Sequence, residues 1–139
     1  MTPPRLERAP LGAALADAAA LVAFVALGRR SHDLHGGSGW FVVVLWPFLV
    51  GWFAAAAATG LYTARSRPWR RLSATCLLGV TLALVLRATV TGRATPVVFG
   101  VVALGFVGLA TAGWRAVARV VTGSTPAPAR VSAGQRRSG

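Results

Sequence analysis

The chain alternates four long apolar runs with short polar segments. The apolar runs cover residues 11–28, 40–62, 72–90 and 94–114, and none shows the two-residue alternation of a β-strand. A helix that rises 1.5 Å per residue crosses a bilayer core of about 30 Å with about 20 residues, and in lipid only helices and closed barrels satisfy their own backbone groups. The pattern therefore predicts an all-α integral membrane protein with four transmembrane helices in a compact bundle.

The segments outside the four runs carry most of the arginines. We take residues 1–10 as an N-terminal segment, 11–119 as the transmembrane domain, and 120–139, which is rich in Gly, Ser, Pro and Arg, as a disordered tail. With four spans, the N-terminus, the 63–71 loop and the C-terminal part share one side and hold eleven of the 15 arginines. Because short cytoplasmic segments carry the basic excess, both termini of this cell-membrane protein are expected in the cytoplasm.

The first run also has a second interpretation. Arg5 and Arg8 precede it and it ends in Ala26-Leu27-Gly28, which resembles a secretory signal with its small-residue cleavage site. Asp17 within the run, and two arginines directly after it, favour an uncleaved span.

The charge balance is strongly basic. The 15 basic residues are all arginine and stand against three acidic ones, giving a formal net charge of +12, while 55% of the chain is hydrophobic. Clustered arginines can bind nucleic acid, but these flank apolar runs, which favours anionic lipid headgroups at the cytoplasmic face as partners and no nucleic acid. Cys76 is the single cysteine, so an internal disulfide is excluded.

Small residues recur at helical spacing in three of the runs. Without a hydrophobic effect between helices in lipid, such stripes allow close backbone approach. They predict buried seams at three sets of positions: Gly51, Ala55 and Thr59; Thr75, Gly79 and Ala83, ending in Arg87; and Gly105, Gly108 and Ala112.

Tryptophans fall at the expected membrane interfaces and deeper. Trp40, Trp69 and Trp114 lie near the ends of runs, where an indole N–H can stay in contact with water. Trp46 and Trp52 lie deeper, where helix packing competes with a ligand-stacking role.

Two charged residues fall within the runs, where an unpaired charge costs about 2.5–3.5 kcal/mol on insertion scales. Asp17 lies six residues into the first run and Arg87 lies 15 residues into the third. At 1.5 Å per residue their depths differ by about 13 Å, which excludes a bridge between them. Arg115 closes the fourth run near the depth of Asp17, so we expect an intramembrane ion pair between Asp17 and Arg115.

The stretch 28–40, GRRSHDLHGGSGW, gathers several polar side chains between two spans. His32, Asp33 and His35 are potential metal ligands, but the preceding arginines and the flexible Gly-Gly-Ser-Gly argue against a metal or haem site, and no cofactor is expected. Arg87 is expected at the same outer level. We therefore predict an outer polar cluster that binds a headgroup, an anion or a proton, formed by Arg29, Arg30, His32, Asp33 and Arg87.

The order of these features resembles a known family. The features are an aspartate in the first run, GRRSH at 28–32, WPFLVGW at 46–52, an arginine near the end of the third run, and GWR at 113–115. Together they are similar to the small four-span membrane proteins named domain of unknown function three thousand and fifty-four. The resemblance covers residues 11–115 and implies an architecture and a set of candidate residues, without an activity.

Two classes of function stay open. No catalytic arrangement is found, since Asp17 and Asp33 are expected on opposite sides of the membrane and Ser31 only neighbours His32 in sequence, so an enzyme is not expected. The first class is a structural or accessory component of the cell membrane that contacts lipid or a membrane-protein partner. The alternative is a small homo-oligomeric transporter or channel for a proton, a cation or a small solute, with Asp17 as the carrier.

Overall fold

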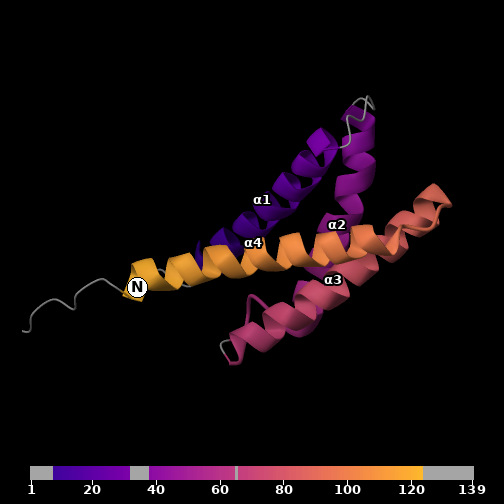
Figure 1. Cartoon of the computed structure of the whole chain (residues 1–139). Helices are drawn as coiled ribbons and strands as arrows, with labels where there is room; N and C mark the ends of the chain where they lie inside the picture. The colour runs from indigo at the N-terminus through magenta and orange to yellow at the C-terminus, as the bar shows by residue number, and fades with distance from the viewer. Residues whose placement is uncertain (1–7, 32–37, 65, 124–139) are drawn as a thin grey trace, which may run out of the picture.

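The computed structural model describes residues 8–31, 38–64 and 66–123 of the chain. These residues form four helices and no strand: α1 (Arg8–Ser31), α2 (Ser38–Thr59), α3 (Pro68–Thr91) and α4 (Val97–Gly123). Each helix packs against the next along the chain and α4 packs back against α1, whereas the described backbones of α1 and α3 do not contact each other. The helices therefore form a ring in which the start of α1 and the end of α4 lie at the same end of the molecule (Figure 1).

All four helices are long and apolar enough to cross a membrane. The candidate spans are Pro10–Arg29, Phe41–Thr59, Pro68–Thr91 and Val97–Thr122. The all-α prediction with four potential spans is confirmed in this form.

The boundaries of the last helix differ from the prediction. Gly92 ends α3 in the left-handed conformation, with φ 64°, and α4 begins after Pro96, whose carbonyl accepts hydrogen bonds from the amides of Phe99 and Gly100. Proline is tolerated at a helix start because its missing N–H would have no partner there. Helix α4 thus starts at Val97 instead of residue 94 and continues to Gly123, into the stretch that we assigned to the tail.

The surface of the helices is apolar. Large aliphatic side chains are exposed on each of them, for example Leu15 (62%), Val42 (59%), Leu77 (57%) and Leu109 (77%). Soluble monomers rarely expose apolar patches on this scale. The surface is that expected of helices surrounded by hydrocarbon.

A cluster of phenylalanines fills the space between α1, α2 and α4. Phe24 of α1 lies 5.4 Å from Phe48 of α2, 5.9 Å from Phe99 and 5.5 Å from Phe106 of α4, measured between ring centroids. Phe48 and Phe99 are 6.2 Å apart. These separations fall in the favourable range of about 4.5–7 Å for aromatic pairs, so the rings connect helices whose backbones do not all meet.

Helices α2 and α3 pack closest, along two of the predicted small-residue stripes. A Cβ atom added to Gly51 would lie 2.5 Å from the carbonyl oxygen of Gly79 and 2.8 Å from the amide nitrogen of Ala83. Further along the same seam, the hydroxyls of Thr59 and Thr75 share a hydrogen bond of 2.6 Å. The two stripes therefore face each other in antiparallel register, as close backbone approach requires.

The third stripe was wrong in part. Gly105 is exposed and an added Cβ would meet nothing within 4 Å, whereas Gly108 lies against the sulfur of Cys76. The fully buried positions of α4 are Ala103, Val107 and Thr111. Successive four-residue steps from Ala103 define the inner face, and Gly105 lies on the far side of it.

The contact at Gly51 gives a direct test of the seam. Gly51→Ala should lower the free energy of unfolding by about 1–3 kcal/mol, because the new methyl group must displace the backbone of α3. Gly105→Ala is the matched control and should be neutral or stabilising by up to about 1 kcal/mol, since alanine favours the helix. Unfolding in mixed micelles with increasing SDS, followed by circular dichroism, measures both. Equal effects of the two substitutions would contradict the seam.

Candidate functional site

Asp17 lies on the inner face of α1. The buried residues of this helix are Asp17, Leu21, Phe24 and Val25, which fall on one side at helical spacing. The side chain of Asp17 has no exposed surface. A carboxylate in such a position is stable only if it is paired and hydrogen-bonded.

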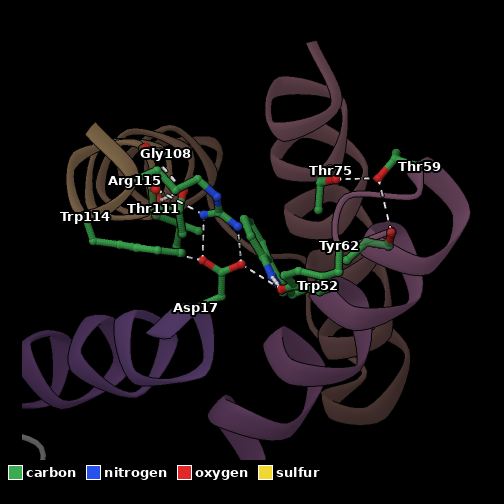
Figure 2. Close-up of polar contacts among 11 residues, drawn as sticks. Asp17, Trp52, Thr59, Tyr62, Thr75, Gly108, Thr111, Trp114 and Arg115 are labelled. Carbon is green, nitrogen blue, oxygen red and sulfur yellow. Dashed lines mark hydrogen bonds and ion pairs between the residues drawn. The ribbon is translucent and has the colours of Figure 1, made fainter. Parts of the chain in front are cut away.

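Four donors surround the Asp17 carboxylate (Figure 2). Arg115 of α4 binds it with both terminal nitrogens, Nη1 to Oδ1 and Nη2 to Oδ2, each at 2.7 Å. The indole Nε1 of Trp114 donates to Oδ1 at 2.9 Å, and the hydroxyl of Tyr62 donates to Oδ2 at 2.7 Å. Each carboxylate oxygen therefore accepts two hydrogen bonds.

Arg115 is held by α4 itself as well as by Asp17. Its Nη1 also donates to the carbonyl oxygen of Thr111 at 3.0 Å, and its guanidinium carbon lies 4.5 Å from the centroid of the Trp114 ring. The side chain of Arg115 is 13% exposed. The guanidinium is thus held by the Asp17 carboxylate, a carbonyl oxygen and an aromatic ring. Because it is already oriented, it binds the carboxylate in bidentate geometry with little loss of side-chain entropy.

Tyr62 links the carboxylate to α2. The indole of Trp52, which is fully buried, donates from Nε1 to the Tyr62 hydroxyl at 3.0 Å. The hydroxyl in turn donates to Asp17, so the hydrogen bonds run in one direction from α2 to α1. Hydrogen bonds in such a chain polarise one another, which strengthens the bond from Tyr62 to Asp17.

The turn after α2 places Tyr62 within reach of α1. Gly60 has φ 64°, and the amide of Leu61 donates to Ala56 at 2.9 Å while that of Gly60 donates to Ala57 at 3.2 Å. These two bonds form the Schellman arrangement that ends many helices at a glycine. The chain reverses here, which directs Tyr62 back along α2 instead of away from it.

Arg71 at the start of α3 stabilises the same turn. Its Nη1 donates to the carbonyl oxygen of Thr59, the last residue of α2. Its Nε donates to the carbonyl oxygen of Ser66 at 3.0 Å. A cation at a helix C-terminus also interacts favourably with the helix dipole. Arg71 thus holds the turn that presents Tyr62.

Tyr62 lies beyond the candidate span of α2 and stays protonated. Burial, and after it the hydrogen bond to the Asp17 carboxylate, raises the pKa of the Tyr62 phenol above its ordinary value. The phenol is therefore a donor to Asp17 at neutral pH.

The arrangement leaves the carboxylate fully occupied. A carboxylate offers about four acceptor positions, and in Asp17 four donors use them, two of them from a cation. Such a group has no acceptor position left for a transported proton or a metal ion. Among the described residues, no group of three His, Cys, Asp or Glu side chains forms a metal site.

The structure contains the ion pair expected from depth, whereas the outer cluster stays a prediction. Arg87 lies over the ring of Phe99 in α4, with its guanidinium carbon 5.1 Å from the centroid. Arg29 and the backbone of Arg30 belong to α1, which does not contact the backbone of α3. His32 and Asp33 lie outside the described residues, as does His35.

Three partners in the Asp17 network were missed from the sequence. Trp114 was expected at a wet interface, but its indole N–H donates to Asp17, so that expectation was wrong. Tyr62 and Trp52 were not assigned to Asp17. Two signals point to them in retrospect: Trp114 adjoins Arg115, and Tyr62 is the single tyrosine, placed directly after the glycine that ends a span.

These features define a small protein whose described residues form four helices, each a candidate membrane span, with a carboxylate of α1 saturated by donors from α4 and from the turn after α2. The chain belongs to the family described as Protein of unknown function (DUF3054), whose model matches residues 14–118. The match confirms the resemblance seen in the sequence motifs and includes all members of the Asp17 network. No curated protein and no solved structure matches the chain.

Because Tyr62 is the single tyrosine, its titration can be followed alone. We expect the tyrosinate absorbance band of the folded protein to appear at a higher pH than in the chain unfolded in guanidinium. The stabilisation from the phenol should be complete below the unfolded pKa of about 10 and be lost as pH rises through the raised value of the folded state. In Asp17→Asn the titration should move back toward that of the unfolded chain. Coincident titrations of folded and unfolded protein would contradict the hydrogen bond.

Proposed function

We propose that the protein is a multi-pass protein of the cell membrane with a structural or accessory role, in which the Asp17–Arg115 pair ties α1 to α4. One observation carries this proposal: Asp17 is fully buried and accepts hydrogen bonds from four donors. A carboxylate in this state supports an assembly and is unsuited to carrying a proton or a cation across it.

The lengths of the four helices and their exposed apolar side chains support insertion into a membrane. Each candidate span has 19 to 26 residues and a mean hydropathy of 1.8 to 2.1. At 1.5 Å per residue these helices match a hydrocarbon core of about 30 Å. Their exposed leucines and valines would face lipid tails.

The distribution of arginine supports an orientation with both termini in the cytoplasm. The start of α1, the α2–α3 turn and the end of α4 lie at one end of the molecule, and eleven of the 15 arginines belong to these segments and the chain termini. The positive-inside rule assigns that end to the cytoplasm.

The same end is suited to anionic lipid headgroups. Trp69 at the start of α3 is 47% exposed, and the Arg119 guanidinium carbon lies 4.5 Å from its ring centroid. Arg67 and Arg70 are exposed beside it. Basic residues near a membrane surface contribute roughly 1 kcal/mol each toward anionic lipid, and an exposed indole is typical of the interface.

The orientation can be tested with single cysteines. In a Cys76→Ala background, which removes the single native thiol, Ser66→Cys places a thiol in the α2–α3 turn and Ala94→Cys places one in the α3–α4 turn. A membrane-impermeant maleimide added to intact cells should label Ala94→Cys, and it should label Ser66→Cys only after permeabilisation. The Cys76→Ala protein alone should remain unlabelled. The reverse pattern would contradict the proposed orientation, and equal labelling of both sites in intact cells would contradict insertion.

The structural role of Asp17 can be tested by a double-mutant cycle. Asp17→Asn should destabilise the protein by about 3–5 kcal/mol, because Arg115 is left buried without its counter-charge. Arg115→Gln alone should be similarly damaging. Combined with Asp17→Asn, it should recover part of the loss, giving a coupling energy of about 2–3 kcal/mol. Arg70→Gln, at an exposed arginine of α3, is the control and should change stability by less than about 0.5 kcal/mol. The measurement is SDS-induced unfolding, together with the level of protein in the membrane.

A transport role for Asp17 predicts a different outcome. Wild-type protein in liposomes would then move protons or cations, and Asp17→Asn would keep its stability while losing that flux. We expect no flux above empty liposomes and a clear loss of stability. A stable, correctly inserted Asp17→Asn protein with a specific loss of flux would overturn the structural role.

A further inference from the structure

A polar hollow opens at the end of the molecule opposite the Asp17 network. It lies between the end of α3 and the start of α4 and has a volume of about 410 Å³. Arg87, Thr91, Arg93, Ala94, Thr95 and Pro96 line it. This is a concave site lined by two cations and two hydroxyls, placed where the helices emerge from their apolar surroundings.

The two arginines have no acidic partner among the described residues. The sequence holds three acidic residues, Glu7, Asp17 and Asp33, and the one in the described part is occupied by Arg115. Arg87 is half-buried and rests on the face of the Phe99 ring. A guanidinium stacked on an aromatic ring is fixed in its plane while its N–H edge stays available to an acceptor.

A second observation points to a missing acceptor or donor at the same place. The Oγ1 atom of Thr95 is buried and has no hydrogen-bond partner in the described part of the chain. Buried hydroxyls are almost always partnered, so each exception requires an explanation. A rotation about χ1 turns a threonine hydroxyl toward a neighbouring ligand.

The start of α4 adds a favourable field. Pro96 precedes the first helical residues and its side chain offers no oxygen to their amides, in contrast to the usual Ser, Thr, Asp or Asn caps. Helix N-termini of this kind attract anions through free N–H groups and the helix dipole.

We propose that this hollow binds a phosphate-type oxyanion through the guanidinium groups of Arg87 and Arg93, with the hydroxyl of Thr95 as a further ligand. Planar guanidinium groups match phosphate oxygens in bidentate geometry, and Arg93 at the rim can close over an anion seated on Arg87. The oxyanion is the phosphodiester of an anionic lipid headgroup or a soluble phosphate. The lipid source rests on the proposed membrane insertion, whereas the soluble source does not.

The experiment uses the full chain in a phosphate-free, uncharged detergent. Inorganic phosphate, and separately short-chain phosphatidylglycerol below its micelle concentration, are titrated into the protein and binding is measured by calorimetry. Arg93→Gln changes an exposed side chain and should lower affinity about tenfold, the effect expected for loss of a charge-assisted hydrogen bond. Thr89→Val changes an exposed side chain of α3 that does not line the hollow, so it is the control and should leave affinity within about twofold.

Two further variants separate binding from folding. Arg87→Lys keeps the charge over Phe99 but loses the bidentate fork, so affinity should fall while the melting temperature stays close to that of the wild type. Thr95→Val should lower affinity several-fold and leave the melting temperature of the ligand-free protein equal or higher, because a buried hydroxyl without a partner is removed.

The two titrants distinguish the sources of the oxyanion. Binding of phosphatidylglycerol but not of inorganic phosphate assigns the site to a lipid headgroup, and binding of inorganic phosphate that competes with the lipid assigns it to a soluble anion. Either result supports the site if Arg93→Gln weakens binding and Thr89→Val does not. Absence of binding by both titrants, or equal losses in the two variants, would overturn the proposal. The cysteine-labelling pattern is independent of this outcome, so a failure of the proposed insertion would be recognised separately.

Discussion

The structure depends on the pairing of one carboxylate within an apolar helix. Asp17 stands in the middle of a segment, LGAALADAAA, whose small side chains offer little to pack against a neighbour. An unpaired charge at such a place costs several kilocalories per mole, and an isolated ion far more by Born solvation. Saturation by Arg115, Trp114 and Tyr62 removes this cost. The satisfaction of Asp17 therefore requires α4 and the end of α2 to lie beside α1.

Different physical forces close the two halves of the helix ring. Helices α2 and α3 meet through glycines and hydroxyls, where backbone atoms approach closely enough for dispersion and hydrogen bonding to act without large side chains. Helices α1 and α4 meet through the Asp17 network and the ring of Phe24. Tyr62 joins the halves, since the turn held by Gly60 and Arg71 presents it to Asp17. A substitution that moves this turn would therefore disturb the hydrogen bonds of Asp17 in α1, although the substituted residue lies outside α1.

Much of the fold followed from one-dimensional patterns, and the remainder depended on geometry that such patterns do not contain. Hydrophobic length gave the four helices, and four-residue spacing gave the α2–α3 seam. Matching of depth from the shared end of two antiparallel spans led to the pair of Asp17 and Arg115. Depth does not give the rotation of a helix about its own axis, which is why Gly105 was placed inside and the indole N–H of Trp114 was placed in water. The chain reversal after α2 could not be predicted from periodicity either, because Tyr62 joins the network from outside any helix.

An ion pair joins α1 to α4 at a place where apolar side chains could also pack. In lipid, apolar contacts between helices are nearly equivalent to contacts with hydrocarbon, so they fix neither depth nor rotation. A bidentate pair with two additional donors is directional, and it fixes α1 at one level against α4. Phe24, two turns further along α1, supplies a second fixed point among the aromatic rings. Two such points fix the position of α1 along α4 and its rotation, which apolar contacts alone would not do in the proposed membrane surroundings.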